Sequence, residues 1–522
     1  MSSEAKYSKG IWSVITASSV GTLIEWYDFY IFGSLATIIA AQFFPEDKGS
    51  AALLSTLAIF AAGFIVRPFG ALVFGRLGDI VGRKYTFLLT LVLMGGSTFA
   101  IGLIPNYKSI GVAAPLLVLL LRLIQGLALG GEYGGAATYV AEHSPAHKRG
   151  FYTSWIQTTA TLGLFVSLGV ILFTRSSMGV EKFNDWGWRI PFLVSSLLVI
   201  LSIYIRLKMN ESPLFSKLKA EGKTSVNPLK ESFTKRDNLK MVLLALFGAV
   251  MGQGVIWYTG QFYAQSFIEN VCKIEFAQSR TILLWAIAFA TPFFVVFGAL
   301  SDKIGRKWIM MAGMLLGIFC YRPIYQHFID ITTEKNKVEI VDQRSVERIA
   351  TLIPNAADSL VKTTTVKHFE DGAMFKEVKT DTMYVATGKT AIKPAIKIEK
   401  TVGDSNYWTF IFLIFVQILF VTMVYGPIAA FLVELFPTRI RYTSMSLPYH
   451  IGNGVFGGLV PFISTLIIEY TKSPENPTGS PLAGLWYPII VASVCLIIGA
   501  LYLTNKVDKN VRDDENDYIH KH

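Results

Sequence analysis

The decapeptide GRLGDIVGRK at residues 75 to 84 recurs in altered form as GALSDKIGRK at residues 298 to 307. The charged and small residues that the two copies share include Gly75, Asp79 and Arg83 in the first and Gly298, Asp302 and Arg306 in the second. Farther along each half a second set recurs, namely Glu142, Pro145 and Arg149 against Glu434, Pro437 and Arg441. Two separate sets repeated in the same order predict a chain built from two related halves.

Long apolar runs flank both decapeptides. The chain is 52% hydrophobic and only 16% charged, with a mean hydropathy of +0.45, whereas soluble domains are about 45 to 50% apolar. Because about 20 helical residues cross the hydrocarbon layer, each long run predicts a membrane span. Twelve spans are expected: 11 to 40, 52 to 74, 85 to 104, 115 to 141, 152 to 174, 188 to 207, 241 to 270, 280 to 300, 308 to 328, 407 to 432, 443 to 468 and 484 to 504. The predicted fold class is an all-α polytopic membrane protein.

Lysine and arginine concentrate in alternate loops, including those that hold the two decapeptides. Positive charge marks the cytoplasmic side of short loops, so both decapeptides, the linker and both termini are predicted to be cytoplasmic. The predicted organisation is an N-terminal half at 1–207, a linker at 208–240, a C-terminal half at 241–505 and a tail at 506–522. The net charge of +11 is spread over these short clusters instead of one basic stripe, which argues against a nucleic-acid partner.

The two repeated sets lie much farther apart in the second half than in the first, so the second half carries extra chain between its third and fourth spans. This piece, at about 329 to 406, is polar and is predicted to face away from the cytoplasm. Its stretches TMYVATG (382–388) and AIKIEKTV (395–402) contain β-branched residues in partial alternation, which predicts a few strands. We interpret it as a small decorative subdomain; a module that captures substrate is the alternative.

The repeated decapeptide resembles the signature of the major facilitator superfamily. Four further stretches resemble its metabolite:proton symporter group: EWYDFYIFG (25–33), RLIQGLALGGEYGGAATYVAE (122–142), GQGVIWYTGQFYA (252–264) and ELFPTRIRYTSMSL (434–447). The resemblance implies the major facilitator fold, with a binding site between two six-helix halves. It also implies a conformational gate at Asp79, Arg83, Glu142, Arg149, Asp302, Arg306, Glu434 and Arg441. The insertion at 329–406 departs from the usual pattern of this family.

Two acidic residues lie within the first span. An ionised side chain at the bilayer centre costs about 2.5 to 3.5 kcal/mol on insertion scales, so Glu25 and Asp28 need a compensating environment. Their i, i+3 spacing places them on one helix face. We predict that they couple transport to protons, with Glu25 as the first candidate and Asp28 as the second. A purely structural role in helix packing is the alternative.

Other polar residues within the spans are candidates for substrate binding. Arg122, Gln125 and Glu132 share one face of the fourth span. Arg122 can hold a substrate carboxylate or pair with Glu25, and both interpretations stay open. The seventh span offers Gln253, Trp257, Tyr258 and Gln261, whose aromatic rings could also attract a quaternary ammonium. His450 in the eleventh span is a further candidate, although a packing role is the more common one for a lone membrane histidine.

The sequence therefore predicts a multi-pass protein of a bacterial inner membrane that imports a small organic acid or zwitterion together with a proton. An osmoprotectant carrier for betaine or proline is the alternative within the same class, and a membrane sensor built on a transporter scaffold is the alternative outside it. Metal-ligand clusters, nucleophile motifs and phosphate-binding loops are not recognised, so neither a cofactor nor enzymatic activity is expected. The expected partners are the metabolite, the proton and the lipid bilayer, and we expect a monomer.

Overall fold

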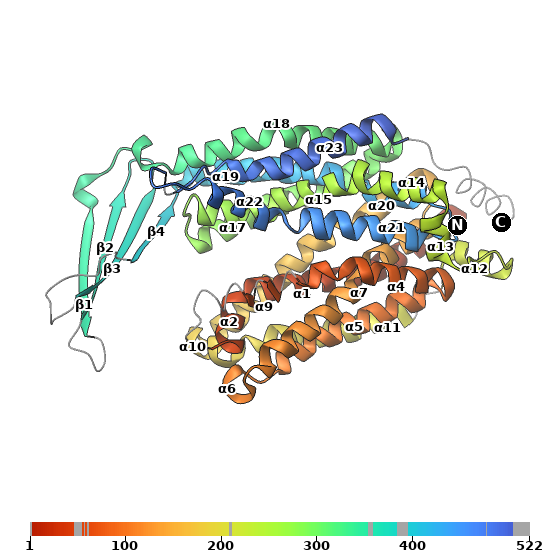
Figure 1. Cartoon of the computed structure of the whole chain (residues 1–522), viewed down its shortest axis with the longest axis horizontal. Coiled ribbons are helices and arrows are strands. Elements are labelled where there is room, and N and C mark those ends of the chain that lie inside the picture. The colour runs from red at the N-terminus through yellow and green to blue at the C-terminus, as the bar shows by residue number, and fades with distance from the viewer. Residues whose placement is uncertain are drawn as a thin grey trace.

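The computed structural model describes residues 3–45, 55–56, 58–59, 62–207, 211–352, 359–383, 395–476 and 478–504. Long helices form two bundles that lie side by side, and a β-sheet projects from one end of the molecule (Figure 1). We call this end the sheet end. The opposite end, where the chain passes from one bundle to the other, is the linker end.

The N-terminal bundle is formed by the chain up to Leu207. Its long helices are α1 (Ser3–Ser34), α2 (Ala36–Phe43), α4 (Arg67–Ile80), α5 (Arg83–Leu103), α7 (Ala113–His143), α8 (Arg149–Gln157), α9 (Thr159–Met178) and α11 (Arg189–Leu207). Short elements are α6 (Tyr107–Ile110), η2 (Ala146–Lys148), α10 (Val180–Lys182) and η3 (Phe183–Gly187). The linker follows with α12 (Pro213–Ala220) and α13 (Pro228–Thr234).

The C-terminal bundle contains the remaining helices. They are α14 (Arg236–Ala245), α15 (Met251–Tyr258), α16 (Ala264–Asn270), α17 (Phe276–Ile304), α18 (Arg306–Thr332), α19 (Asp404–Tyr425), α20 (Ile428–Leu435), α21 (Arg441–His450), α22 (Val460–Tyr470) and α23 (Trp486–Tyr502). Short π-helical turns join several of them: η4 (Leu246–Val250), η5 (Thr259–Tyr263) and η8 (Ile451–Gly457). The 3₁₀ turns are η6 (Glu334–Asn336), η7 (Val341–Gln343) and η9 (Ala483–Leu485).

Ten helical segments of the described chain are long and apolar enough to cross a membrane. The first predicted span is a bent pair, in which 10–34 and 36–43 meet at 64°, and it makes an eleventh. Part of the predicted span at 52–74 lies outside the described residues.

Small residues allow the helices of the N-terminal bundle to approach closely. A Cβ atom added to Gly130 on α7 would collide with the backbone of α4 at Arg67 and Ala71, and one added to Gly126 would collide with the backbone at Gly63. Close backbone contact at glycine is a common way of packing membrane helices, because lipid supplies little hydrophobic drive for their association. The glycines therefore fix how near α4 lies to α7.

The predicted insertion contains a four-stranded antiparallel meander in the order β1-β2-β3-β4. Its strands are β1 (Ser345–Leu352), β2 (Ser359–His368), β3 (Met374–Met383) and β4 (Ala395–Thr401). The prediction of strands is confirmed, and β4 coincides with the AIKIEKT stretch, whereas residues 384–388 of TMYVATG lie outside the described residues.

Hydrogen bonds attach the sheet to the C-terminal bundle. The backbone nitrogen of Glu275, just before α17, donates to the carbonyl oxygen of Lys400 at 2.8 Å. The side chain of Gln278 on α17 binds both the backbone nitrogen and the carbonyl oxygen of Val402, each at 2.9 Å. The Lys400 ammonium donates to the carbonyl oxygen of Thr332 at the end of α18, at 2.6 Å.

Candidate functional site

Two buried carboxylates on α1 lie at the centre of the site. Glu25 is 7% exposed and Asp28 is 1% exposed. The Glu25 carboxylate lies 3.9 Å from the guanidinium of Arg67, the first residue of α4. This contact is at the outer limit of an ion pair, and the guanidinium also stacks on the ring of Phe64 at 4.4 Å from its centroid. Glu25 is thus held only loosely.

Asp28 belongs to a separate relay of hydrogen bonds. The hydroxyl of Thr98 on α5 donates to Asp28 at 2.6 Å, and the amide of Gln125 on α7 donates to Thr98 at 2.8 Å. The guanidinium of Arg122 in turn donates to the amide oxygen of Gln125 at 2.5 Å and lies over the ring of Phe32. The relay therefore links the predicted proton site Asp28 to the predicted substrate residues Gln125 and Arg122.

A small pocket is lined by both Arg67 and Arg122. Its volume is about 10 Å³, which is room for roughly one water molecule. It is lined by Phe29, Gly63, Phe64, Arg67, Arg122, Gln125, Gly126 and Leu129. In this conformation the pocket is too small for a metabolite, so a larger solute requires the surrounding side chains to move.

Aromatic rings from both bundles fill the space beside this pocket. The rings of Trp26 on α1 and Trp257 on α15 are 4.9 Å apart between centroids. Phe262 on η5 packs edge-on against Phe29 at 5.2 Å and parallel to Tyr30 at 6.1 Å. These ring contacts join the two bundles. If the rings separated, a cavity would open between the bundles.

A second aromatic layer joins the bundles through tyrosines. Tyr133 on α7 stacks on Tyr449 of α21 with centroids 3.7 Å apart, and the hydroxyls of Tyr449 and Tyr425 on α19 are 2.7 Å apart. The amide of Gln157 on α8 donates to the hydroxyl of Tyr133 at 2.8 Å. None of these tyrosines was singled out from the sequence, because an apolar helix offers many aromatic residues and no pattern marks those that face the other bundle.

The remaining predicted substrate residues are all buried, but they differ in their contacts. Gln253 exchanges two hydrogen bonds with Asn453 of η8, at 2.9 and 3.1 Å, so its amide is already satisfied. Tyr258 packs against Phe64 across the bundles, and Gln261 is 6% exposed on η5. The Nε1 atom of Trp257 and the Nε2 atom of His450 are buried without a hydrogen-bond partner in the described residues.

Glu132, the third member of the polar stripe with Arg122 and Gln125, does not line the pocket. Its carboxylate pairs with Arg206 of α11 at 2.6 Å and accepts a hydrogen bond from Thr90 at 3.0 Å. Both members of the ion pair are about 1% exposed or less. This is an internal contact of the N-terminal bundle, away from the pocket lined by Arg122 and Gln125.

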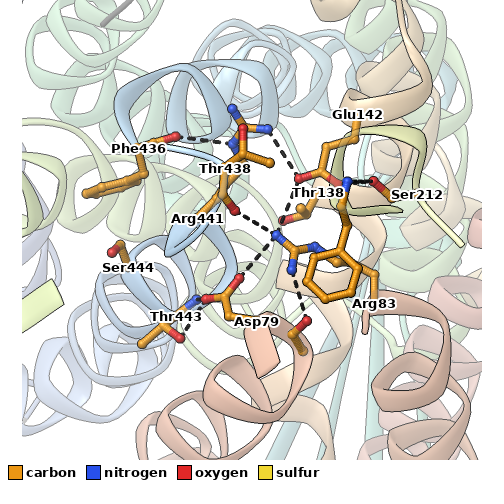
Figure 2. A network of polar contacts seen from close by, with 12 residues as sticks. Asp79, Arg83, Thr138, Glu142, Ser212, Phe436, Thr438, Arg441, Thr443 and Ser444 are labelled. Atoms are coloured by element: carbon orange, nitrogen blue, oxygen red, sulfur yellow. Dashed lines mark hydrogen bonds and ion pairs between the residues drawn. The ribbon is translucent and has the colours of Figure 1, made fainter. Parts of the chain in front are cut away.

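The repeated decapeptides and the repeated Glu/Arg sets meet at the linker end. In the first charge cluster (Figure 2), Arg83 lies 3.1 Å from Asp79 and 3.5 Å from Glu142. Arg441 of the C-terminal bundle reaches the same Glu142 at 3.2 Å. Asp79 accepts hydrogen bonds from the backbone nitrogen and the hydroxyl of Thr443, at 2.9 and 2.8 Å.

The second charge cluster repeats this arrangement with the bundles exchanged. Arg306 lies 2.7 Å from Asp302 and 2.9 Å from Glu434, and Arg149 of the N-terminal bundle lies 3.4 Å from Glu434. Asp302 accepts hydrogen bonds from the backbone nitrogens of Gly150 and Phe151, both at 2.8 Å. The eight residues predicted to form a gate therefore come together in two pseudosymmetric clusters, each of which contains residues of both bundles.

The first glycine of each decapeptide explains why the bundles approach so closely here. A Cβ atom on Gly75 would lie 3.0 Å from the Cα of Thr443 in α21, and one on Gly298 would collide with Ser154 and the backbone of Gly150 in α8. The later glycines serve the turns, because Gly82 and Gly305 have φ angles of 143° and 97°, which disfavour other residues. The repeated pattern is thus a contact between bundles as well as a turn.

Comparisons with known proteins agree with this architecture. Residues 14–226 match the family model described as "Sugar (and other) transporter". The chain is 32% identical over 494 residues to the inner membrane metabolite transport protein YhjE of Escherichia coli (strain K12), which covers 94% of each chain. A solved structure of the major facilitator superfamily proton:xylose symporter XylE superimposes with a TM-score of 0.61 at 16% identity, covering 97% of this chain and 99% of that one. This chain belongs to the major facilitator superfamily.

Two further relatives have names that state a substrate. The citrate-proton symporter of Klebsiella pneumoniae is 29% identical over 485 residues, which covers 92% of this chain and 89% of that protein. The proline/betaine transporter of Escherichia coli (strain K12) is 36% identical over 310 residues, which covers 57% of this chain and 61% of that protein. The predicted resemblance and fold class are confirmed, and this major facilitator protein is a multi-pass membrane transporter and not an enzyme.

Two arginines within the predicted spans of this major facilitator protein, one at the pocket and one inside the N-terminal bundle, were missed in the sequence. Arg67 lies inside the predicted span 52–74, and Arg206 lies at the end of the span 188–207. The argument that flagged Glu25 and Asp28, the cost of a charge within the membrane, applies to Arg67 and would have found it. Arg206 lies at the end of its span, where an arginine side chain usually reaches the interface, so the same argument does not single it out. Clusters of three or more His, Cys, Asp or Glu residues able to hold a metal were not found in the described part of the chain.

Proposed function

We propose that this protein is a proton-coupled symporter that imports a small organic acid or zwitterionic metabolite by alternating access. The observation that carries the proposal is the loose Glu25–Arg67 ion pair, whose arginine lines one pocket together with Arg122. We assign the linker end to the cytoplasm, because the basic loops lie there.

The coupling follows from the shared arginine. When Glu25 is ionised, its negative charge competes with an incoming carboxylate for Arg67. When Glu25 takes up a proton, that competition ends and the guanidinium becomes available to hold the substrate. Proton and substrate therefore favour the same state of the protein, which is the physical requirement for coupled movement.

The substrate class follows from the chemistry around the pocket. Two guanidiniums and one amide favour a carboxylate, since a guanidinium stays charged and can bind a carboxylate through two hydrogen bonds. The adjoining rings of Trp26, Trp257 and Phe262 bound the cavity that separation of the bundles would open. A molecule with one carboxylate and a compact apolar or cationic body fits these surroundings.

Alternating access follows from the two ends of the molecule. In the conformation described here the charge clusters hold the bundles together at the linker end, and the aromatic layers fill the centre. We assign this conformation to an occluded state with a closed cytoplasmic gate. Import requires the aromatic layers to separate first, and the charge clusters to break afterwards.

The proposal is tested by uptake into proteoliposomes. Labelled α-ketoglutarate, citrate, shikimate, proline and betaine are offered with and without an inward proton gradient. We expect gradient-driven accumulation of at least one compound by the unchanged protein. Glu25→Gln, which mimics the protonated carboxyl, should abolish that accumulation while exchange of labelled for unlabelled substrate continues.

Glu181→Gln, on α10 and outside the pocket, is the matched control and should accumulate substrate normally. Full gradient-driven accumulation by Glu25→Gln would show that the proton is carried elsewhere, and Asp28→Asn would then be tested in the same way. Binding of a ligand without flux by the unchanged protein would favour the sensor alternative over transport.

The aromatic rings favour one second candidate, a carrier for betaine or proline. The indole rings of Trp26 and Trp257 pack against each other at the junction of the bundles with centroids 4.9 Å apart, and indole faces freed by separation of the bundles would attract a quaternary ammonium group. If betaine is the substrate, Trp257→Leu should raise its KM strongly, whereas uptake of a dicarboxylate would depend far less on the indole. Comparison of the two substrates in one variant separates the candidates.

A further inference from the structure

An apolar groove runs along the outside of the C-terminal bundle at the linker end, between α14 and α23. Its volume is about 450 Å³, and it is lined by Arg236, Leu239, Lys240, Leu243, Leu244, Phe247, Ile498 and Tyr502. Both helices belong to segments long and apolar enough to span the membrane, so the groove faces lipid. It has no part in the pocket beside Glu25 or in the two charge clusters.

Charge and apolar surface are separated along the groove. Arg236 and Lys240 stand one turn apart in the first turns of α14, and every lining residue of that helix after Lys240 is apolar. The helix rises about 1.5 Å per residue, so Arg236 and Phe247 are about 16 Å apart along its axis. That length is about half of the 30 Å hydrocarbon layer, and therefore the depth of one leaflet.

The two basic side chains are not engaged in ion pairs or side-chain hydrogen bonds within the described residues, and both are exposed. Their acidic neighbour Asp237 does not line the groove. Tyr502 closes the groove on the α23 side near the end of that helix, with an exposed ring of the kind that favours the membrane interface. The end of the groove at Arg236 and Lys240 therefore attracts an anion, and the apolar remainder of the groove accepts a hydrocarbon chain.

We propose that this groove binds an anionic phospholipid, with the phosphate of its headgroup at Arg236 and Lys240 and one acyl chain along Leu243, Leu244 and Phe247. The charge of the head end complements the phosphate, and the length of the apolar part matches one leaflet. A soluble acidic peptide satisfies the first feature but not the second, because it would place polar backbone against an apolar wall.

The site is tested by titrating the purified full-length protein in detergent with phosphatidylglycerol or with phosphatidylcholine, and counting bound lipids by native mass spectrometry. Each basic residue near a membrane surface contributes about 1 kcal/mol to the attraction of anionic lipid. Two residues therefore predict a preference of about 30-fold for phosphatidylglycerol, which corresponds to about 2 kcal/mol.

The double variant Arg236→Gln/Lys240→Gln should lose this preference. Lys219→Gln/Lys230→Gln, which removes the same charge from exposed positions on α12 and α13, should keep it. Leu244→Trp, which fills the groove, should weaken the binding of both lipids. The melting temperature of each variant in lipid-free detergent checks that it is folded.

An undiminished preference in the double variant would overturn the proposal. The acidic tail of the chain, with Asp513, Asp514 and Glu515, is the competing occupant. Neutralising these three residues should leave lipid binding unchanged. If it increased lipid binding instead, the tail and the lipid would compete for the same groove, which would also place the lipid there.

Discussion

Arg67 is the residue on which the proposed coupling depends, because it lines the pocket with Arg122 and also contacts Glu25. A hydrogen bond to a charged partner contributes about 1.5 to 3 kcal/mol, so loss of one such contact with a substrate carboxylate weakens binding about tenfold or more. We therefore expect Arg67→Gln to raise the KM of a carboxylate substrate by about tenfold or more.

The measurement is initial uptake against substrate concentration at several external pH values. Since the proton on Glu25 is proposed to free Arg67, the KM of the unchanged protein should fall as external pH falls, and that dependence should disappear in Arg67→Gln. Arg175→Gln, an exposed arginine at the end of α9, should leave the KM and its pH dependence unchanged. A normal KM in Arg67→Gln together with a raised KM in Arg122→Gln would assign the carboxylate to Arg122.

Glu132 illustrates a buried charge with a structural role. It pairs with Arg206 at 2.6 Å inside the N-terminal bundle. Removal of one member of a buried pair strands the other charge and costs about 3 to 5 kcal/mol. Glu132→Gln should therefore lower the melting temperature of the purified protein strongly, and the double variant Glu132→Met/Arg206→Met should recover most of the loss.

The exposed pair between Glu469 and Lys472 provides the comparison, because an exposed pair contributes about 1 kcal/mol or less. Glu469→Gln should leave the melting temperature nearly unchanged. If Glu132→Gln were as stable as Glu469→Gln while uptake was lost, Glu132 would belong to the transport pathway after all.

For individual residues, the sequence identified charged side chains inside apolar spans, but it did not identify the residues with which they pair. Glu25, Asp28 and Arg122 were recognisable because an isolated charge in an apolar run needs an explanation. The pairing of Glu25 with Arg67, and of Glu132 with Arg206, depends on how three or more helices pack. Helical periodicity gives the face of one helix and says nothing about which other helix meets that face.

Among the elements, α8 and α21 have N-termini that are capped by the opposite bundle. Asp302 accepts hydrogen bonds from two backbone nitrogens in the first turn of α8, and Asp79 accepts one from the backbone nitrogen of Thr443 in the first turn of α21. Carboxylates stabilise helix N-termini because the first backbone N–H groups lack partners within the helix. A cap that belongs to the other bundle breaks when the bundles part, so it stabilises only the conformation that is closed at the linker end.

Asp302→Asn should therefore favour opening at the linker end. Asparagine keeps one acceptor oxygen, but it loses the ion pair with Arg306 and one of the two backbone hydrogen bonds. We expect the labelling rate of a cysteine placed at the fully buried Ser444 to rise about tenfold, since loss of about 1.4 kcal/mol changes a population tenfold. The native cysteines Cys272, Cys320 and Cys495 are replaced by serine in this experiment.

Asp79→Asn should have the same effect through α21, because the two clusters are equivalent. The matched control is Asp237→Asn, at an exposed position near the same end of the molecule. Unchanged labelling in both gate variants would show that the caps do not hold the closed conformation. If the labelling rate also rose in Asp237→Asn, the increase would be an effect of the changed net charge.

The helices themselves were predictable to within a few residues, because apolar length fixes a membrane span. The predicted 85 to 104 and 188 to 207 correspond to α5 (Arg83–Leu103) and α11 (Arg189–Leu207). The 64° bend after Ser34 and the π-helical turns η4, η5 and η8 were not predictable. These features arise where a helix adapts to its neighbours, and no residue pattern within the helix specifies them.

For the whole molecule, the repeated decapeptides predicted two related halves, and the halves meet at the positions that are repeated. The insertion was found from the unequal spacing of those repeats, and β4 from its alternating residues. The order and register of the strands could not be predicted from the sequence. In β1 and β2 the alternation of apolar and polar residues is too weak to distinguish a strand from a polar loop. The attachment of β4 to α17 depends on Gln278, a residue in a different part of the chain.

The attachment of the sheet predicts the effect of removing it. Ser345 on β1 and Glu399 on β4 lie in register through Val366 and Lys376, three strand spacings apart, which is about 14 Å. A linker of about six glycine and serine residues spans that distance and can replace residues 346–398. Because Lys400, Val402 and Gln278 stay in place, α17 and α18 keep these hydrogen bonds, whereas Asn406 of α19 loses its hydrogen bond to Asp371.

We expect this shortened transporter to take up substrate with a KM and a maximal rate within about twofold of the full chain. The hydrogen bonds that attach the described part of the sheet reach α17, α18, α19 and the loop before α17, and the residues that make them do not line the pocket with Arg67. Uptake into proteoliposomes measures both quantities, and Gln278→Ala in the full chain reports the effect of loosening the attachment alone. The contrary outcome is a raised KM in the shortened transporter although its melting temperature is normal and Gln278→Ala takes up substrate normally. That result would mean that the sheet gathers substrate before the substrate reaches the pocket. The insertion would then belong to the transport pathway, and its position at the sheet end would mark the entrance.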